Sequence, residues 1–370
     1  MAGDLRVALE EIGAVDHHAH ALSGAGVDWS LPDLLSESGE VDQRAQMRHH
    51  PSYHRALAEL GVADEAALAG AREEAGFDAH AKALMSACRL EGLFIDDGFP
   101  VAGALDLAAH ADLAGCPVRR LVRIESEVEA AARGWPSFER VRESFRESVA
   151  GALADGAAGL KTVAAYRCGL DLPHPGEDEA RSAYRAWRMS GSRRLVSPAL
   201  IAYFLAEALE VARTSGPVPL QIHTGVGDAD LALHRADPSL LGRVIAEAGA
   251  AGVPVVLLHC YPYVRQAAWL AHVHSHVYVD LSLSLLLIGH RGSEVITEAL
   301  ELAPATKILF ATDASRAPEM FFLAARWWRA ALAGALDRLV GERAVGERTA
   351  LEWAEMILAG NARRLYGLTG

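Results

Sequence analysis

The chain of 370 residues is poor in several kinds of residue, and each shortage excludes a class of protein. It has only four cysteines (Cys88, Cys116, Cys168 and Cys260), and no two of them form a C-x-x-C pair. This spacing supports neither a zinc finger nor a disulfide framework, so we expect a reducing, cytoplasmic compartment. Basic residues number 35 against 48 acidic ones, and a net charge of -13 argues against a nucleic-acid partner.

Long apolar runs are also missing. The longest, Leu281–Ile288, is far too short to span a bilayer, and residues 1–15 lack the basic start of a signal peptide. We therefore expect no membrane partner. No G-x-G-x-x-G or G-x-x-x-x-G-K-[ST] motif follows an apolar run, which argues against an open, doubly wound nucleotide-binding sheet. Since hydrophobic residues still make up 51% of the chain, it can bury a sizeable core.

What recurs is a short apolar, β-branched run followed by a stretch rich in Ala, Leu, Glu and Arg. Strands that alternate with helices in this way form parallel β/α units, and eight such units predict a (β/α)8 TIM-type barrel. The predicted strands are Gly13–Asp16, Gly92–Asp96, Val118–Ile124, Gly159–Val163, Val218–His223, Val253–His259, His276–Leu281 and Lys307–Ala311. Helices are predicted over Val128–Asp155, Pro198–Ser215, Pro238–Ala251, Val264–Val273 and Gly292–Leu302.

Two segments are longer than this repeat allows. Residues 21–90 read as a mostly helical insertion after the first strand, which we expect to cover the mouth of the barrel. Residues 324–368 read as a helical C-terminal tail. We therefore predict a single barrel domain over residues 1–370, with the 21–90 insertion within it.

Histidines, at sixteen, outnumber cysteines, and two of them stand at the end of the first predicted strand. Side chains at i and i+2 of a strand share one face, so His18 and His20 can ligate one divalent ion while His17 points away. An isolated His-x-His is more often a solvated loop. Three further strand ends favour a metal site over a solvated loop, because His223, His259 and Asp313 each end or follow an apolar strand. The C-terminal ends of the strands of a barrel converge, so these side chains are expected to meet.

Cationic residues lie near the same strand ends. Lys161 interrupts the fourth strand, where burial of its charge is costly without a partner. Three roles remain open for it: it pairs with a substrate carboxylate, it is carboxylated and bridges two metal ions, or it reaches solvent and has no role in the site. Arg123, Tyr166 and Arg167 could bind a substrate carboxylate, although the arginines could equally pair with an acid such as Glu125. Asp280, after the seventh strand, could orient a histidine.

The ordered set Asp16-x-His18-x-His20, His223, His259 and Asp313 resembles that of the amidohydrolase superfamily of metal-dependent barrels. The C-terminal residues 360–367 are similar to the last helix of its amidohydrolase-related branch, which includes aminocarboxymuconate-semialdehyde decarboxylase. The Gly-Leu-Lys and Tyr-Arg-x-Gly-Leu segments of residues 159–170 are similar to the amidohydrolase-like domain that some plants and fungi fuse to a glutamine-synthetase-like domain.

The resemblance implies that His18, His20, His223 and Asp313 hold one divalent ion, zinc ahead of manganese. His259 would act as an acid or base, or would ligate a second ion if Lys161 is carboxylated. Asp313 would also accept the proton of a metal-activated water.

The function expected from these features is hydrolysis of an amide or other C–N bond of a small carboxylate-bearing substrate. A metal-dependent decarboxylase or hydratase, which is a lyase on the same site, is the alternative, and a non-catalytic binding protein is a third. The expected partners are a small-molecule substrate and, by family habit, further copies of the chain.

Overall fold

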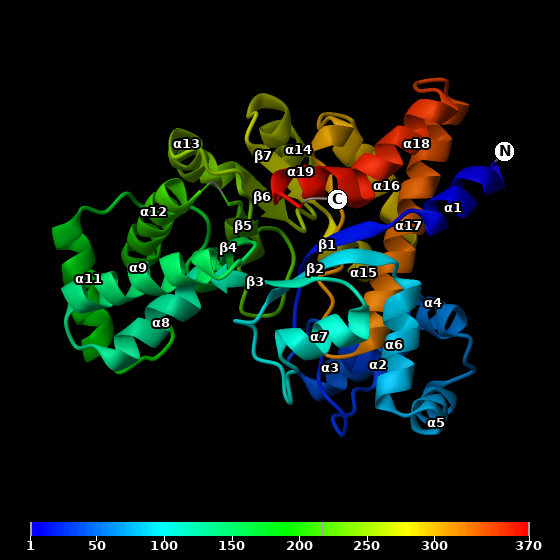
Figure 1. The fold of residues 1–370 in the computed structure, drawn as a ribbon, viewed down its shortest axis with the longest axis horizontal. Coiled ribbons are helices and arrows are strands. Elements are labelled where there is room, and N and C mark those ends of the chain that lie inside the picture. The colour runs from blue at the N-terminus through cyan, green and yellow to red at the C-terminus, as the bar shows by residue number, and fades with distance from the viewer. Residues whose placement is uncertain (1, 217, 369–370) are drawn as a thin grey trace. The chain divides into compact units, whose positions relative to one another are not determined.

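The computed structural model describes residues 2–216 and 218–368. Its eight strands form one sheet in the order β1 to β8, which is the order of a (β/α)8 barrel, and the predicted fold class is confirmed. Figure 1 labels strands β1 to β7. The strands are β1 (Ala14–Ala19), β2 (Leu90–Asp96), β3 (Val118–Arg123), β4 (Gly159–Thr162), β5 (Leu220–His223), β6 (Val255–Leu258), β7 (Val277–Asp280) and β8 (Ile308–Leu309).

Contacts within the chain divide it into two compact units. Unit 1 comprises Met1–Ile95, Phe99–Arg119 and Asp280–Gly370, and unit 2 comprises Asp96–Gly98 and Arg120–Val279.

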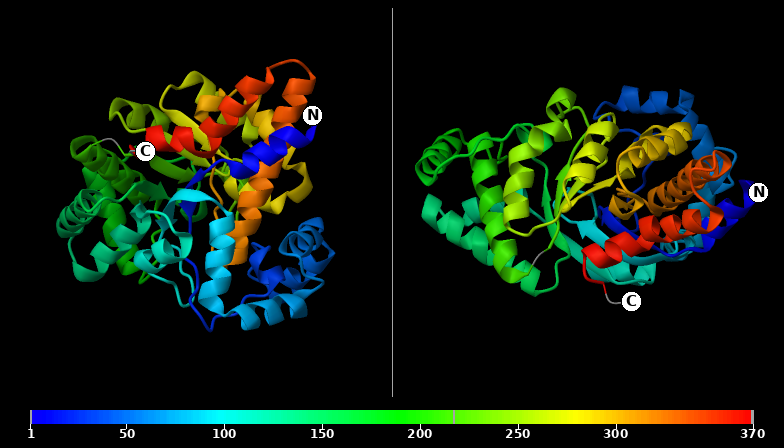
Figure 2. Two further views of the ribbon diagram at one scale, coloured as in Figure 1. Left: turned by 45° about the vertical axis from the view of Figure 1, so that its right-hand side comes forward. Right: turned by 90° about the horizontal axis from the view of Figure 1, so that it is seen from above.

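The long helix α17 (Pro318–Gly341) organises the packing of unit 1. It contacts α1 (Ala2–Glu11), α6 (Phe77–Ala87) and α16 (Gly292–Leu300), and these helices lie beside it in Figures 1 and 2. Its buried Arg329 donates to the backbone oxygens of Leu9 at 3.2 Å, Ile12 at 3.1 Å and Cys88 at 2.9 Å. This side chain therefore satisfies carbonyl groups where α1 and α6 end, groups that a helix cannot bond internally.

Residues 21–90 are mostly helical in the structure, as the sequence predicts. They form α2 (Leu31–Leu34), α3 (Val41–Ala45), α4 (Pro51–Leu60), α5 (Glu65–Ala75) and α6. The C-terminal segment after α17 consists of α18 (Glu347–Glu355), a π-helical turn (Met356–Gly360) and α19 (Asn361–Leu365). None of the described helices is long and apolar enough to cross a membrane.

The helices of unit 2 pack around an aromatic core. Helices α8 (Ile124–Gly134), α9 (Phe138–Ala154) and α12 (Pro198–Ser215) contact one another, and the rings of Phe145 and Phe204 lie 5.0 Å apart. Unit 2 also contains α11 (Glu177–Met189), which precedes α12, and α13 (Gly242–Ala250) and α14 (Val264–Val273), which follow it. Within the sheet, Lys161 on β4 is in register with Arg123 on β3 and Gln221 on β5.

One predicted helix is wrong. The segment Val128–Asp155 is two helices, α8 and α9, separated by residues 135–137. Pro136 lacks the N–H that a continuous helix needs, and the Ser137 side chain accepts a hydrogen bond from Arg140 N to start α9. The first strand is also longer than predicted, since β1 continues to Ala19 and therefore contains His18.

Glu319 on α17 holds two helices of residues 21–90 through one buried carboxylate. Its Oε1 accepts hydrogen bonds from Arg72 Nε on α5 at 2.7 Å and from His80 Nε2 on α6 at 2.8 Å, while its side chain is only 1% exposed. Burial alone would raise the pKa of this carboxyl, but the hydrogen bonds from His80 and Arg72 and the charge of Arg72 outweigh it and lower the pKa to about 2.

We expect Glu319→Gln to lower the free energy of unfolding by about 3 kcal/mol near pH 7, because the carboxylate loses the interactions that lower its pKa. The folded pKa lies below the unfolded one, so this contribution is complete above about pH 4.5 and disappears as the pH falls toward about 2. Urea unfolding at several pH values checks this expectation, because the difference in the free energy of unfolding between wild type and variant should become smaller in acid. The exposed Glu74→Gln on α5 is the control, and a gap independent of pH would contradict the assignment.

Candidate metal centre

Unit 1 brings together three of the predicted ligands. His18 Nε2 lies 3.0 Å and His20 Nε2 lies 3.3 Å from Asp313 Oδ1, and one ligand atom of each residue lies within 4.8 Å of the others. Ligand atoms about 2.0–2.2 Å from a tetrahedral zinc ion are separated by roughly 3.3 Å. The three side chains therefore fit one divalent cation. His18 is buried, whereas His20 and Asp313 keep side-chain exposures of 12% and 8%.

The loop that carries Asp313 is fastened to β1 by backbone hydrogen bonds. Asp313 N donates to His18 O at 3.0 Å, and His20 N donates to Ala314 O at 2.8 Å. The buried Asp16 carboxylate accepts from Thr312 N at 3.0 Å and from Thr312 Oγ1 at 2.5 Å. These bonds hold Asp313 in a left-handed conformation, with φ of 52°, that is uncommon for a residue with a side chain. Burial, opposed by the Thr312 hydrogen bonds, raises the pKa of Asp16 to about 7.

His17 has other partners, as the alternation of a strand predicts. Its Nε2 lies 3.0 Å from Asp280 Oδ2, and its Nδ1 lies 3.2 Å from the Tyr366 hydroxyl. Asp280 Oδ1 also accepts from Ser282 N at 3.0 Å and Ser282 Oγ at 2.8 Å. Asp280 is therefore placed to orient His17, a histidine that the sequence did not predict as a ligand.

Unit 2 gathers a second set of the predicted residues. The His223 ring centre lies 4.4 Å from that of Tyr166 and 4.5 Å from that of His259. His223 Nε2 lies 3.0 Å from Val226 O. Since a carbonyl can only accept, Nε2 donates in this contact, and in the neutral ring Nδ1 then carries the lone pair. Gly227 makes room for Tyr166, because a Cβ there would lie 2.0 Å from the Tyr166 hydroxyl.

Lys161 and the turn that follows it are buried. The whole Lys161 residue is 1% exposed on β4. At the end of the same strand, Glu125 Oε1 accepts from Thr162 Oγ1 at 2.5 Å and from Val163 N at 3.1 Å. This carboxylate fixes the β4 turn much as Asp16 fixes the residues before Asp313, and burial raises its pKa.

Both arginines predicted to contact the substrate are bonded to acids within unit 2. Arg123 Nε donates to Asp96 Oδ1 at 3.1 Å and Oδ2 at 3.0 Å, and its Nη2 donates to Oδ2 at 2.6 Å. Arg167 Nη1 lies 2.9 Å from Glu129 Oε1. Pairing of these arginines with acids was the alternative left open by the sequence, although Glu125 is not the partner of either.

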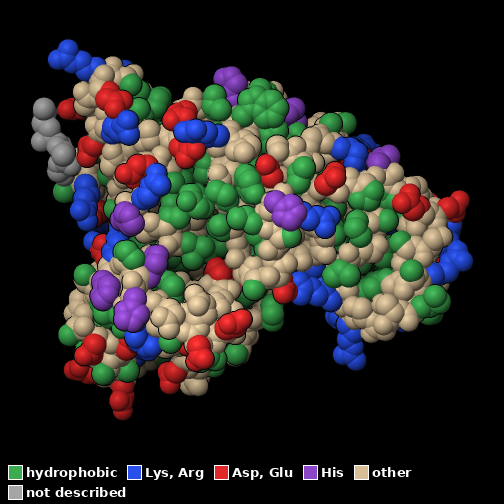
Figure 3. All heavy atoms as spheres, turned by 180° about the vertical axis from the view of Figure 1, so that it is seen from behind, with side chains coloured by type: hydrophobic (Ala, Val, Ile, Leu, Met, Phe, Trp, Pro, Cys, Tyr) green, Lys and Arg blue, Asp and Glu red, His purple; other side chains and the backbone are tan. Residues whose placement is uncertain are grey.

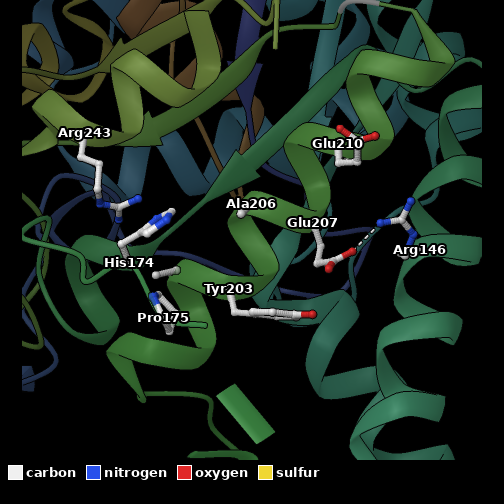
Figure 4. Close-up of a pocket in the computed structure, with 9 residues that line it drawn as sticks. Arg146, His174, Pro175, Tyr203, Ala206, Glu207, Glu210 and Arg243 are labelled. Atoms are coloured by element: carbon white, nitrogen blue, oxygen red, sulfur yellow. Dashed lines mark hydrogen bonds and ion pairs between the residues drawn. The ribbon is translucent and has the colours of Figure 1, made fainter. Parts of the chain in front are cut away.

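A cavity of about 180 Å³ in unit 2 lies among other residues (Figure 4). Its basic side chains are also paired: Arg146 with Glu207, and Arg243 and His174 with Glu247 at 2.6 and 2.9 Å. The residues lining it are Arg146, His174, Pro175, Ala202, Tyr203, Ala206, Glu207, Glu210 and Arg243. None of them belongs to the predicted site.

Sequence reasoning missed the neighbours of His20 and Asp313. The Phe99 ring lies 4.8 Å from the His20 ring, and Thr312 carries the contact to Asp16. Phe99 follows shortly after β2, and Thr312 directly precedes Asp313. Because both residues follow apolar strands, their positions in the sequence could have indicated that they lie near the metal centre.

Comparison with known proteins finds relatives of the same fold. A protein of Lactobacillus casei ATCC 334, whose assignment as a metal-dependent hydrolase is itself provisional, has a crystal structure with a TM-score of 0.89. It is 32% identical, with coverage of 98% of this chain and 97% of that one. Uronate isomerase of Thermotoga maritima shares the fold, with a TM-score of 0.70 at 14% identity and coverage of 99% and 97%.

Among curated proteins, protein fluG of Emericella nidulans is 29% identical over 98% of this chain. The match covers 47% of fluG, so the chain spans about half the length of this relative. The family model described as amidohydrolase matches residues 15–368, a range that includes the ends of β1, β5, β6 and β8. The chain therefore belongs to the amidohydrolase family.

Proposed function

We propose that the protein is a metal-dependent hydrolase that cleaves an amide or other C–N bond of a small carboxylate-bearing substrate. The observation that carries this proposal is the group His18, His20 and Asp313, whose ligand atoms are spaced for one cation in a member of the amidohydrolase family. Two imidazoles and one carboxylate are a donor set that zinc accepts readily, and manganese is the second choice.

His223 is proposed as a further ligand. Its place at the end of β5 and the lone pair on Nδ1 suit it to that role. Lys161 is proposed to contact substrate, and one ion is favoured on that basis. If Lys161 is instead carboxylated, it would bridge two ions and His259 would ligate the second.

The remaining roles follow from the chemistry of the side chains. A divalent cation in this centre supplies a Lewis acid that polarises a carbonyl group and lowers the pKa of water. Asp313 is proposed to accept the proton of the attacking water, and its loop is held for this by the bonds to His18 and Ala314. His259 is proposed to protonate the leaving amine, and the Tyr166 hydroxyl to donate to the substrate.

Removal of the metal tests the function. Chelator-treated protein should lose nearly all hydrolysis of a responsive amide, and added zinc or manganese should restore it. The assay screens small amides with and without a carboxylate and measures both amine and carbon dioxide. Amine release supports the hydrolase, and carbon dioxide without amine supports the lyase alternative. Hydrolysis that is indifferent to the chelator would overturn the proposal.

A further inference from the structure

Arg316 is a half-buried cation of unit 1 whose charge no acid neutralises. Among the described residues its guanidinium has no carboxylate partner, and Nη1 donates only to the backbone oxygen of Asp33, at 3.4 Å. The Asp33 carboxylate is already bound by Arg44 Nε at 2.6 Å and by Ser30 Oγ at 2.6 Å. On the face that Figure 3 shows, by contrast, acidic and basic side chains are intermixed.

Two aromatic rings hold the guanidinium instead. Its Cζ lies 5.2 Å from the ring centre of Trp29 and 5.7 Å from that of Phe99. Trp29 is itself fixed, because its Nε1 donates to Ser23 Oγ at 2.9 Å. Rings within about 6 Å of a guanidinium stabilise its charge, and the N–H groups that do not bond Asp33 can donate to an anion.

Arg316 is close to the metal ligands. Phe99, which contacts Arg316, also lies 4.8 Å from the ring of His20. These two separations limit the distance between the His20 ring centre and Arg316 Cζ to at most 10.5 Å. A short carbon chain between a carboxylate and a scissile carbonyl can span such a distance.

The backbone at Arg316 is held in an unfavourable conformation. Its φ of 72° is left-handed, as is that of Asp313 three residues earlier, and such residues cost of order 1 kcal/mol each. Arg316 N donates to Ala21 O at 2.9 Å, and Ser23 N donates to Arg316 O at 2.8 Å. The segment after His20 therefore fixes Arg316 and the metal ligand in one framework. Strained backbone held in this way is concentrated at functional sites.

We propose that Arg316 binds the carboxylate of the substrate, with Trp29 and Phe99 holding the guanidinium for a two-pronged contact. The assignment rests on the proposed function for the scissile bond but names a different residue for the anionic end. Arg123 and Arg167, which the sequence suggested for that role, are bonded to Asp96 and Glu129. Binding a substrate anion there would require breaking those pairs, whereas Arg316 has none to break.

Binding of straight-chain dicarboxylates, from succinate to adipate, to the metal-free protein tests this assignment. Calorimetry should detect binding of at least one of them to the wild type. Arg316→Met should weaken it by about 10- to 150-fold, the range for a hydrogen bond to a charged group. Arg316→Lys should recover part of the loss. Arg55→Met is the matched control, because Arg55 also lies over a ring, that of Trp327 at 4.7 Å, and donates to a backbone oxygen.

A second measurement does not depend on the variants folding. The indole N–H resonance of Trp29 in the wild type, assigned with Trp29→Phe, should shift when the dicarboxylate is added. Absence of binding, equal binding by Arg316→Met, or an unmoved Trp29 resonance would each overturn the assignment. These outcomes are measured on metal-free protein and report only on carboxylate binding. Failure of the proposed function is a different result, namely hydrolysis that does not depend on metal.

Discussion

Replacing Asp313 with asparagine should reduce kcat at least about 1,000-fold while the protein stays folded. The amide cannot accept the proton of the attacking water, and general-base catalysis alone contributes about 10²–10⁴. It is also a weaker ligand beside His18 and His20, whose Nε2 atoms lie 3.0 and 3.3 Å from Asp313 Oδ1. Steady-state kinetics on an amide found in the screen measures the loss, and thermal unfolding confirms the fold.

The control for this experiment is Asp78→Asn, an isosteric change at an exposed position of α6. It should leave kcat unchanged. An Asp313→Asn protein that keeps more than about a tenth of the wild-type kcat would show that this carboxylate neither holds the metal nor moves the proton.

The largest loss of stability is expected from Asp96→Asn. The Asp96 side chain is buried and receives three hydrogen bonds from Arg123, whose own side chain is 9% exposed. Removing the negative charge leaves a buried guanidinium without its hydrogen-bonded carboxylate, which costs about 3–5 kcal/mol in the free energy of unfolding. Urea denaturation measures it.

The neighbouring pair provides the control. Asp97 accepts from Arg120 Nε at 2.8 Å but is 42% exposed, so Asp97→Asn should cost less than about 1 kcal/mol. Adding Arg123→Met to Asp96→Asn should recover part of the stability, because the unpaired charge is then removed. Equal effects of the Asp96 and Asp97 changes would contradict this account.

The strands, and the places of His18, His20 and Asp313 at strand ends, could be predicted because each depends on local sequence. A buried parallel strand such as β6 is apolar on both faces, which makes it visible in the sequence. His18 and His20 are two residues apart, so their shared face follows from the geometry of one strand. Asp313 could be assigned because it follows the eighth apolar run.

The partners of the charged residues could not be predicted, since they depend on which segments fold together. Arg123 is bonded to Asp96, 27 residues earlier, and not to Glu125, which is two residues away and bonds Thr162 and Val163 instead. Arg316 was overlooked because its importance comes from a left-handed backbone and from two rings distant in the sequence.

Metal content is the most direct test of the metal centre. Elemental analysis of the protein purified without chelator, with metal titration of the apoprotein, should find at least about one divalent ion per chain, zinc foremost. His18→Ala and His20→Ala should each lower the affinity sharply, whereas His54→Ala, at an exposed position of α4, should not. A wild-type protein that binds no divalent ion, or variants that bind it as tightly as the wild type, would contradict the account.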